Sequence, residues 1–244
     1  MATREDFFVA LLLGIGPALA ILWTSLRRFD RPRVEHTLFD DRRVFGGLAV
    51  GMVFGVIASV FVLALPRVDL ASSVLAIVVT FLFEEGFKLV YLNRRGYRGR
   101  FDATFYGVSL GVGAASTAVV ATVVWTALSV LYTVDGFALL VLFSISLCLV
   151  NADTGAIIGF GASRGDMWRA YARAVLVRLA HGGFLLPFLI GAANPWSLLS
   201  AATSLGFALL LYLYVYRVLL PGTLPDDILR EIRRERRRTK AARE

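Results

Sequence analysis

Two carboxylates and one ammonium group lie together inside an apolar stretch of the sequence. Glu84, Glu85 and Lys88 fall in the run TFLFEEGFKLVY, which covers residues 80–91. Because positions three and four apart share one face of an α-helix, both carboxylates are expected on the same face as the ammonium. A charged side chain near the centre of a bilayer costs about 2.5–3.5 kcal/mol on insertion scales, so such groups usually face the protein interior and serve a function. We therefore expect this face to belong to a functional site.

The ammonium balances only one of the two carboxylates. The other is therefore expected to keep a proton or to face a further cation. The choice of lysine is itself informative, because the chain has 26 Lys and Arg residues and only Lys88 and Lys240 are lysine. A compact ammonium makes different contacts from a planar guanidinium. The sequence thus indicates a position where an ammonium group is needed.

Two further polar residues are expected at a similar depth. Counting inward from the flanking arginines at about 1.5 Å per residue, Glu84 and Glu85 lie about 12–15 Å deep on their helix. Asn151 and His181 lie about 18 Å deep on two other helices by the same count. Carboxylates, a carboxamide and an imidazole at one level are groups that a buried metal site or a proton relay requires.

A purely structural interpretation of these residues is the alternative. Glu84 and Lys88 can neutralise each other as an intrahelical pair, and Asp153 can pair with Arg178 on another helix. An asparagine such as Asn151, on a glycine-rich face, often makes only an interhelical hydrogen bond. The adjacent pair of carboxylates is harder to explain in this way, because one lysine does not neutralise both.

The elements that carry these residues are predicted to be membrane spans. The chain has 244 residues, of which 57% are hydrophobic, and its mean hydropathy is +0.70. Apolar runs long enough to cross a bilayer cover residues 6–26, 44–65, 70–92, 104–132, 137–162, 168–191 and 197–219. The predicted fold class is all-α, a polytopic membrane protein with a seven-helix bundle over residues 1–220 and a basic tail over residues 221–244. The single Cys148 excludes a disulfide framework and a cysteine-based zinc site.

Arginine alternates between the connections. The first, third and fifth connections are rich in arginine, whereas the second has only Arg67 and the other two have none. Because cytoplasmic loops carry an excess of Lys and Arg, the amino terminus is predicted outside and the carboxyl terminus in the cytoplasm. The same distribution accounts for most of the net charge of +8, so nucleic-acid binding is not expected. The basic tail is expected to lie on anionic lipid, with partner binding as its alternative role.

Small residues recur every four positions in three of the runs. The repeats are Gly47, Gly51 and Gly55; Gly107, Gly111 and Ala115; and Asn151, Gly155 and Gly159. Such stripes let helix backbones approach closely in lipid. We therefore expect close packing of the helices that carry them.

Five segments of the chain carry short motifs. They read GIGPALAILW at 14–23, FLFEEGFK at 81–88, FDATFYGVSLGVGAA at 101–115, VNADTGAIIGFG at 150–161 and AHGGF at 180–184. In this order they resemble the motifs of the PrsW-type intramembrane metalloproteases, a family distantly related to the CAAX-processing proteases. The Glu-Glu-x-x-Lys motif is the most specific of them, and the similarity covers about residues 8–190.

The resemblance implies a helical membrane bundle with a zinc site. In that site Glu84 and Glu85 would be catalytic, and the metal would be held by His181, Glu85 and Asn151. The resemblance also gives supporting roles to Lys88, Asp102 and Tyr106.

The chain departs from the family pattern at this metal site. Ala118 and Val119 stand where the family has a Glu-Asn pair, Asn151 where it has its first His, and Leu185 where it has its final Asp. A catalytic zinc ion usually takes three protein ligands and leaves one position for water. Asn offers only a weak, neutral carbonyl in place of an imidazole. Asp153 is not expected to compensate, because it points about 200° round the helix from Asn151.

Three functions are compatible with these residues. Ligand count favours a catalytically depleted relative that binds transmembrane segments or partner membrane proteins in the inherited cavity. The second is an active intramembrane metalloprotease that cleaves single-pass membrane substrates, with a metal on His181 and one of the two glutamates, and the other glutamate as general base. The third is a small proton-coupled transporter, although the sequence has no inverted repeat with paired broken helices. The expected location is the plasma membrane of a prokaryote.

Overall fold

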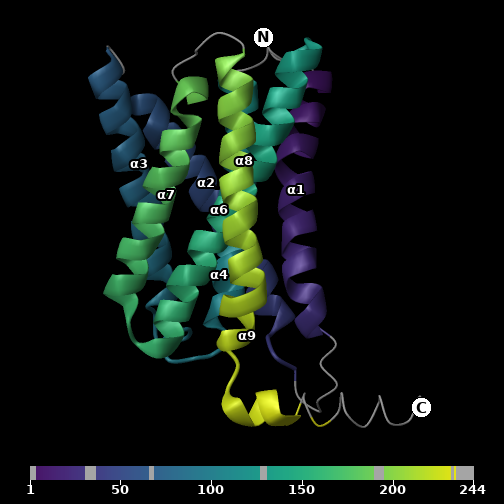
Figure 1. The fold of residues 1–244 in the computed structure, drawn as a ribbon, viewed down its shortest axis with the longest axis vertical. Coiled ribbons are helices and arrows are strands. Elements are labelled where there is room, and N and C mark those ends of the chain that lie inside the picture. The colour runs from purple at the N-terminus through teal and green to yellow at the C-terminus, as the bar shows by residue number, and fades with distance from the viewer. Residues whose placement is uncertain are drawn as a thin grey trace, which may run out of the picture.

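The chain forms a bundle of long helices that run side by side (Figure 1). The computed structural model describes residues 4–30, 37–65, 69–126, 131–189, 195–231 and 234. The long helices are α1 (Arg4–Asp30), α2 (Asp41–Ala64), α3 (Leu70–Leu92), α4 (Ala103–Thr126), α6 (Val134–Arg164), α7 (Met167–Leu189) and α8 (Trp196–Tyr214). A π-helix, η1 (Val215–Leu219), and the short α9 (Leu220–Gly222) continue α8. Seven segments of the described chain are long and apolar enough to cross a membrane, so the predicted all-α architecture with seven such helices is confirmed.

Polar residues set several of the helix ends. Asp40 precedes α2, Asp69 precedes α3 and Thr133 precedes α6, and each side chain accepts a hydrogen bond from a backbone N–H of the first turn. Asp69 and Ser72 form a reciprocal capping box. Hydrogen bonds from the side chain and backbone of Ser72 also lower the pKa of the Asp69 carboxyl. At the other end of α6, Gly165 has a φ of 76°, a left-handed conformation that glycine adopts without strain.

The predicted ends of the spans lie within a few residues of the described helices, apart from the end of the fourth span. The sequence predicts that this run reaches residue 132, and the structure describes α4 as far as Thr126. Residues 127–130 lie outside the described residues, so the end at residue 132 stays a prediction.

Helices α4 and α6 form the centre of the bundle. They pack against each other, while α1 and α2 cover α4 and α7 and α8 cover α6. In Figure 1, α3 and α7 lie together at one side, and α1 lies at the other. The most apolar windows of α4 and α6 are 67% and 61% buried, against 28–33% for the other spans. Polar side chains on α6 therefore face other helices and not lipid.

The stripes of small residues are the contacts between these central helices, as the sequence predicts. A Cβ atom placed on Gly107 would lie 2.0 Å from the carbonyl oxygen of Gly155, and one on Gly111 would lie 1.9 Å from that of Asn151. On the α2 side, a Cβ on Gly51 would lie 2.2 Å from the carbonyl oxygen of Leu110. No side chain fits at these points, so glycine allows the backbones to touch.

The arginine-rich connections lie at one end of the bundle, the end from which the described chain leaves towards its carboxyl terminus (Figure 1). Arg27 and Arg28 stand in the last turn of α1, and Arg164 in that of α6. Three of the predicted loop arginines, Arg31, Arg33 and Arg67, lie outside the described residues. The same holds for residues 232–233 and 235–244 of the basic tail.

Candidate functional site

Lys88 is the centre of a buried hydrogen-bond network between α3 and α6. Its Nζ atom donates to Glu85 Oε1 at 2.7 Å, to Asn151 Oδ1 at 2.9 Å and to Thr154 Oγ1 at 2.8 Å. An ammonium group has three N–H donors, and here each of them has an acceptor. Thr154 donates its own hydroxyl proton to Glu85 Oε1 at 3.0 Å. The lysine thereby ties a carboxylate of α3 to two polar side chains of α6.

Arg178 on α7 supplies a second buried cation. Its Nη2 atom donates to Glu84 Oε2. Its Nε atom lies 3.6 Å from Glu85 Oε1, within range of an ion pair but too far for a hydrogen bond. The guanidinium also lies over the ring of Phe81, 4.6 Å from its centroid. Glu84, Glu85, Lys88 and Arg178 are referred to below as the charge cluster.

The charge cluster contains two negative and two positive groups, so its formal charge is zero. Glu84 is 8% exposed and Glu85 is fully buried, which confirms the prediction that both face the interior and not lipid. The expected further cation is Arg178. Removing either member of such a buried pair leaves an unbalanced charge, which is strongly destabilising.

The pairing within the cluster differs from the intrahelical alternative. Lys88 pairs with Glu85, three positions away, and not with Glu84, four positions away. Helical spacing allows both pairs, and contacts with α6 select the first, because Asn151 and Thr154 accept the other two protons of the ammonium.

His181 connects α7 to α6 and α8. Its Nε2 atom lies 2.7 Å from Ser146 Oγ, which lies 3.1 Å from Ser204 Oγ. The imidazole is fully buried. Its other nitrogen, Nδ1, has no hydrogen-bond partner among the described residues.

A cavity of about 740 Å³ extends from one end of the bundle to the charge cluster. Near its mouth it is lined by Trp125 and Asp135, which stand at the ends of α4 and α6 opposite the arginine-rich connections. Trp125 is 49% exposed, so the cavity reaches the surface there. Glu84, Arg178 and His181 come from the middle of their helices and form its floor.

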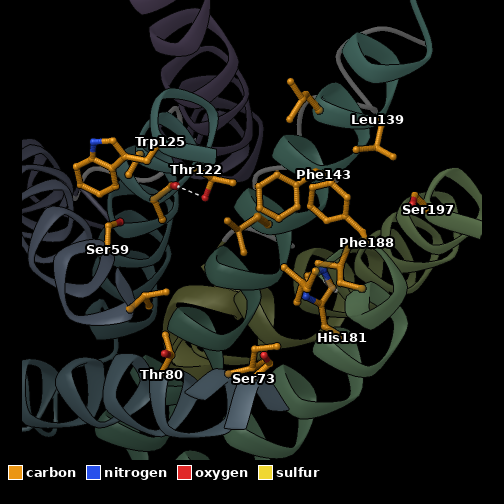
Figure 2. Close-up of a pocket in the computed structure, with 18 of the residues that line it drawn as sticks. Ser59, Ser73, Thr80, Thr122, Trp125, Leu139, Phe143, His181, Phe188 and Ser197 are labelled. Carbon is orange, nitrogen blue, oxygen red and sulfur yellow. Dashed lines mark hydrogen bonds between the residues drawn. The ribbon is translucent and has the colours of Figure 1, made fainter. Parts of the chain in front are cut away.

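Between mouth and floor the cavity walls are mainly apolar. Large apolar side chains of α6 and α7 in the wall include Leu139, Leu140, Phe143, Leu185 and Phe188. Figure 2 shows His181, Phe143 and Phe188 on one side of the pocket and Ser59 and Trp125 on the opposite side. The cavity therefore has an apolar body above a polar floor.

Two side chains of the floor carry nitrogen atoms without a hydrogen-bond partner among the described residues. These atoms are Nη1 and Nε of Arg178 and Nδ1 of His181. Arg178 is 2% exposed and His181 is fully buried. Buried polar atoms are nearly always hydrogen-bonded in folded proteins, so these three atoms are exceptions among the described residues.

The residues expected to hold zinc are engaged with other side chains of the protein in this arrangement. Glu85 and Asn151 both direct an oxygen at the Lys88 ammonium, which already occupies the cation position between them. The Nε2 atom of His181 is engaged with Ser146. Within the described chain, no three His, Cys, Asp or Glu residues form a group that could hold a metal ion.

Asp102 and Tyr106 lie at the arginine-rich end and do not line the cavity. The Tyr106 hydroxyl donates to Asp102 Oδ2 at 2.9 Å and accepts from the backbone N–H of Asp40 at 3.0 Å. Arg100 donates twice to the same carboxylate, at 2.9 and 2.6 Å, and these contacts raise the pKa of its guanidinium. The two residues therefore join the start of α4 to the start of α2 and do not touch the charge cluster.

Asp153 is not part of the site. The suggested pair with Arg178 is absent, because Arg178 binds the two glutamates. Asp153 is fully buried on α6, and both of its carboxylate oxygens lack a hydrogen-bond partner among the described residues.

Sequence reasoning missed Arg178 and the hydroxyls of Thr154 and Ser146 as members of the site. A signal for the arginine was present: it stands three positions before His181, on the same helix face. Counted inward from Arg169 it lies about 13 Å deep, the level of Glu84. The hydroxyl groups had no such signal, because serine and threonine are common in membrane helices without a functional role.

No protein-family model matches this sequence, and comparisons with curated proteins and with solved structures gave no significant match. The described residues form a bundle with seven helices that are long and apolar enough to cross a membrane, with an electrically neutral charge cluster at the floor of a cavity.

Proposed function

We propose that this protein is a non-catalytic membrane protein of the PrsW type that binds a small, largely apolar ligand in its cavity. One observation carries the proposal: both carboxylates of the Glu-Glu-x-x-Lys motif are bound by cations of the protein itself. A general base has to be free to accept a proton from water, and a metal ligand has to be free to bind the metal. Glu84 and Glu85 are instead held by Arg178 and Lys88.

The size of the cavity indicates what it binds. Small-molecule sites have volumes of about 300–1,000 Å³ and mostly apolar walls with a few polar groups. The volume of about 740 Å³ and the walls described above fit this range. A transmembrane helix of 20 residues is about 30 Å long and about 10 Å wide, which corresponds to about 2,400 Å³. A whole transmembrane segment is thus about three times too large, and such a client would have to dock outside and insert only a few side chains.

We also propose that the arginine-rich end faces the cytoplasm, as the distribution of arginine predicts. The mouth of the cavity then opens towards the outer side of the membrane. A ligand would enter from that side or from the outer leaflet.

Cavity-filling variants test this function. Leu139→Trp and Ala118→Phe each place a large ring in the cavity, and Leu210→Trp is a matched control on the exposed face of α8. The probe is radiolabelled 1-decanol, added to the full-length protein in nanodiscs. We expect saturable binding to the wild type and to Leu210→Trp, and loss of at least 90% of it in the two cavity variants. Equal binding by all four proteins would refute a cavity site.

A further inference from the structure

We propose that the ligand of the cavity is an alcohol whose hydroxyl group donates a hydrogen bond to the Glu84 carboxylate at the floor. This inference rests on the proposed function and names the chemistry that the same cavity recognises. Glu84 lines the cavity, and 11% of its side-chain surface is accessible. Its Oε2 atom is bound by Arg178, whereas Oε1 accepts no hydrogen bond from the described residues and is not fully buried. Oε1 is therefore a charged acceptor that a ligand in the cavity can reach.

Hydroxyl groups of the cavity wall present further acceptors. Ser59, Ser73 and Thr80 line the cavity from α2 and α3 (Figure 2). Each donates its proton to the backbone carbonyl oxygen four positions earlier in the chain, at 2.7–2.8 Å. A hydroxyl group has one proton and two lone pairs, so only the lone pairs of these three oxygens remain for a ligand. A ligand that donates hydrogen bonds therefore fits this wall better than one that only accepts them.

The donors near the floor are buried or already engaged. Arg178 is 2% exposed, and its unpaired atoms Nη1 and Nε are buried. Ser204 donates its proton to the carbonyl oxygen of Ala201 at 2.9 Å. Ser146 therefore donates to Ser204 and accepts from Nε2 of His181, and in the neutral imidazole Nδ1 is then an acceptor. Among the described residues, the floor thus offers a ligand an acceptor and no accessible side-chain donor.

The charges around the floor favour a neutral head group. The charge cluster is neutral, because each of its glutamates has its own cation. A carboxylate in the ligand would place a second negative charge beside Glu84, and an ammonium group would leave a net positive charge in a buried site. Asp135 does not balance such a charge, because it is exposed at the mouth, about 24 Å along α6 from Asn151 by the rise of an α-helix. An alcohol supplies a donor without adding charge.

The remainder of the ligand is expected to be apolar. Leu139, Phe143, Leu185 and Phe188 line the wall above the floor, and each buried CH₂ group of a ligand would favour binding. The chemical class is therefore an alcohol with an aliphatic or aromatic body, small enough for a cavity of about 740 Å³.

Two isomeric probes test the donor. 1-Decanol and 1-methoxynonane have the same composition, but the second has an ether oxygen, which accepts hydrogen bonds and cannot donate them. Each competes with radiolabelled 1-decanol for the full-length wild-type protein in nanodiscs, and affinities are referred to the concentration of the probe in the bilayer. We expect decanol to bind about tenfold more tightly than the ether, because its hydrogen bond goes to a charged acceptor. Decanoate and decylamine, measured in the same way, should both bind more weakly than decanol.

Two paired variants locate the acceptor. Glu84→Met with Arg178→Met removes the ion pair that lines the cavity. Glu85→Met with Lys88→Met removes the other pair, whose members are not among the described lining residues, and is the matched control. Each paired variant keeps the cluster neutral.

The ratio of the decanol affinity to the ether affinity is compared between these variants. The ratio of about tenfold should fall to within about twofold without Glu84 and should stay in the control. If the first paired variant does not fold, Glu84→Gln keeps the shape of the side chain. It should lower the ratio to about threefold, because a neutral acceptor makes a weaker hydrogen bond.

The outcomes separate this inference from the proposed function. The alcohol site is refuted, while the cavity site stands, if the wild type binds the two isomers equally or binds decanoate or decylamine at least as tightly as decanol. The same holds if the folded Glu84 variants keep the tenfold ratio. If none of the probes binds saturably, both proposals fail.

Discussion

At the scale of one residue, the hydrogen bonds of Lys88 explain why a lysine stands at this position. Its three acceptors belong to Glu85, Asn151 and Thr154 and lie within 2.9 Å of Nζ. A planar fork with five donors cannot place three hydrogen bonds around one point. This accounts for a lysine in a chain whose only other lysine is Lys240. The reason lies in the contacts with α6, which the sequence did not reveal.

A double-mutant cycle tests this pairing. Lys88→Met should destabilise the protein by about 3–5 kcal/mol, because it leaves the buried Glu85 carboxylate without its cation. Adding Glu85→Gln should recover part of the loss, since the charged pair is then removed as a pair. The matched control is Glu84→Gln, which should recover less, because Glu84 pairs with Arg178 and the Arg178 guanidinium is only within ion-pair range of Glu85. The stability of each variant is measured by thermal unfolding in detergent. Equal recovery of stability by both glutamine variants would contradict the observed pairing.

Asp153 is also a buried ionisable residue, but unlike Lys88 it has no hydrogen-bond partner among the described residues. Asp153→Asn keeps the shape of the side chain and removes the carboxylate. We expect it to raise the free energy of unfolding by about 1 kcal/mol, because an uncompensated buried carboxylate is costly. Asp135→Asn, at an exposed position at the start of α6, serves as control and should not stabilise. A lower melting temperature for Asp153→Asn would mean that the carboxylate has a stabilising contact.

At the scale of elements, the glycine stripes place the site. Helices α4 and α6 touch at Gly107 and Gly155 and again at Gly111 and Asn151, so the position of Asn151 depends on a contact between backbones. The sequence predicted the close contact of these helices from the four-residue spacing. It did not predict which side chains of α6 reach Lys88, because that depends on the rotation of α6 against α3.

Gly111→Ala tests the contact between α4 and α6. The added Cβ would lie 1.9 Å from the carbonyl oxygen of Asn151, so one backbone must move. We expect a loss of about 1–3 kcal/mol in stability, the usual cost of overpacking. Gly86→Ala on α3 is the control, because its Cβ would meet nothing within 4 Å, and alanine is the better helix former. The melting temperatures of the two variants are compared with that of the wild type. An unchanged melting temperature for Gly111→Ala would show that α4 and α6 are further apart than in this structure.

At the scale of the whole molecule, some features of the structure could be predicted from the sequence and others could not. Apolar runs and the cost of buried charge predicted the helices and the inward direction of Glu84 and Glu85, because both depend on local physical properties. The identity of the second cation, Arg178, and the size and lining of the cavity were not predicted, because they depend on how the helices tilt and pack. The resemblance to PrsW-type proteases stays a prediction, and the ion pairs of Glu84 and Glu85 are the observation on which the non-catalytic proposal rests.

Orientation in the membrane is testable with single cysteines. The native Cys148 is fully buried and should not react. Cysteines replacing the exposed Asp135 and Arg98 lie at opposite ends of the bundle. A membrane-impermeant maleimide added to intact cells should label Asp135→Cys and leave Arg98→Cys unlabelled until the cells are permeabilised. The reverse pattern would place the mouth of the cavity in the cytoplasm.

The central claim is that the protein's own cations occupy the place of a metal centre. Its most direct test is the zinc content of the purified full-length protein after incubation with excess zinc and removal of free metal. We predict well below one zinc ion per chain, with no difference between wild type and His181→Ala. One zinc ion per chain in the wild type, lost in both His181→Ala and Glu85→Ala, would contradict the account and restore the metalloprotease interpretation.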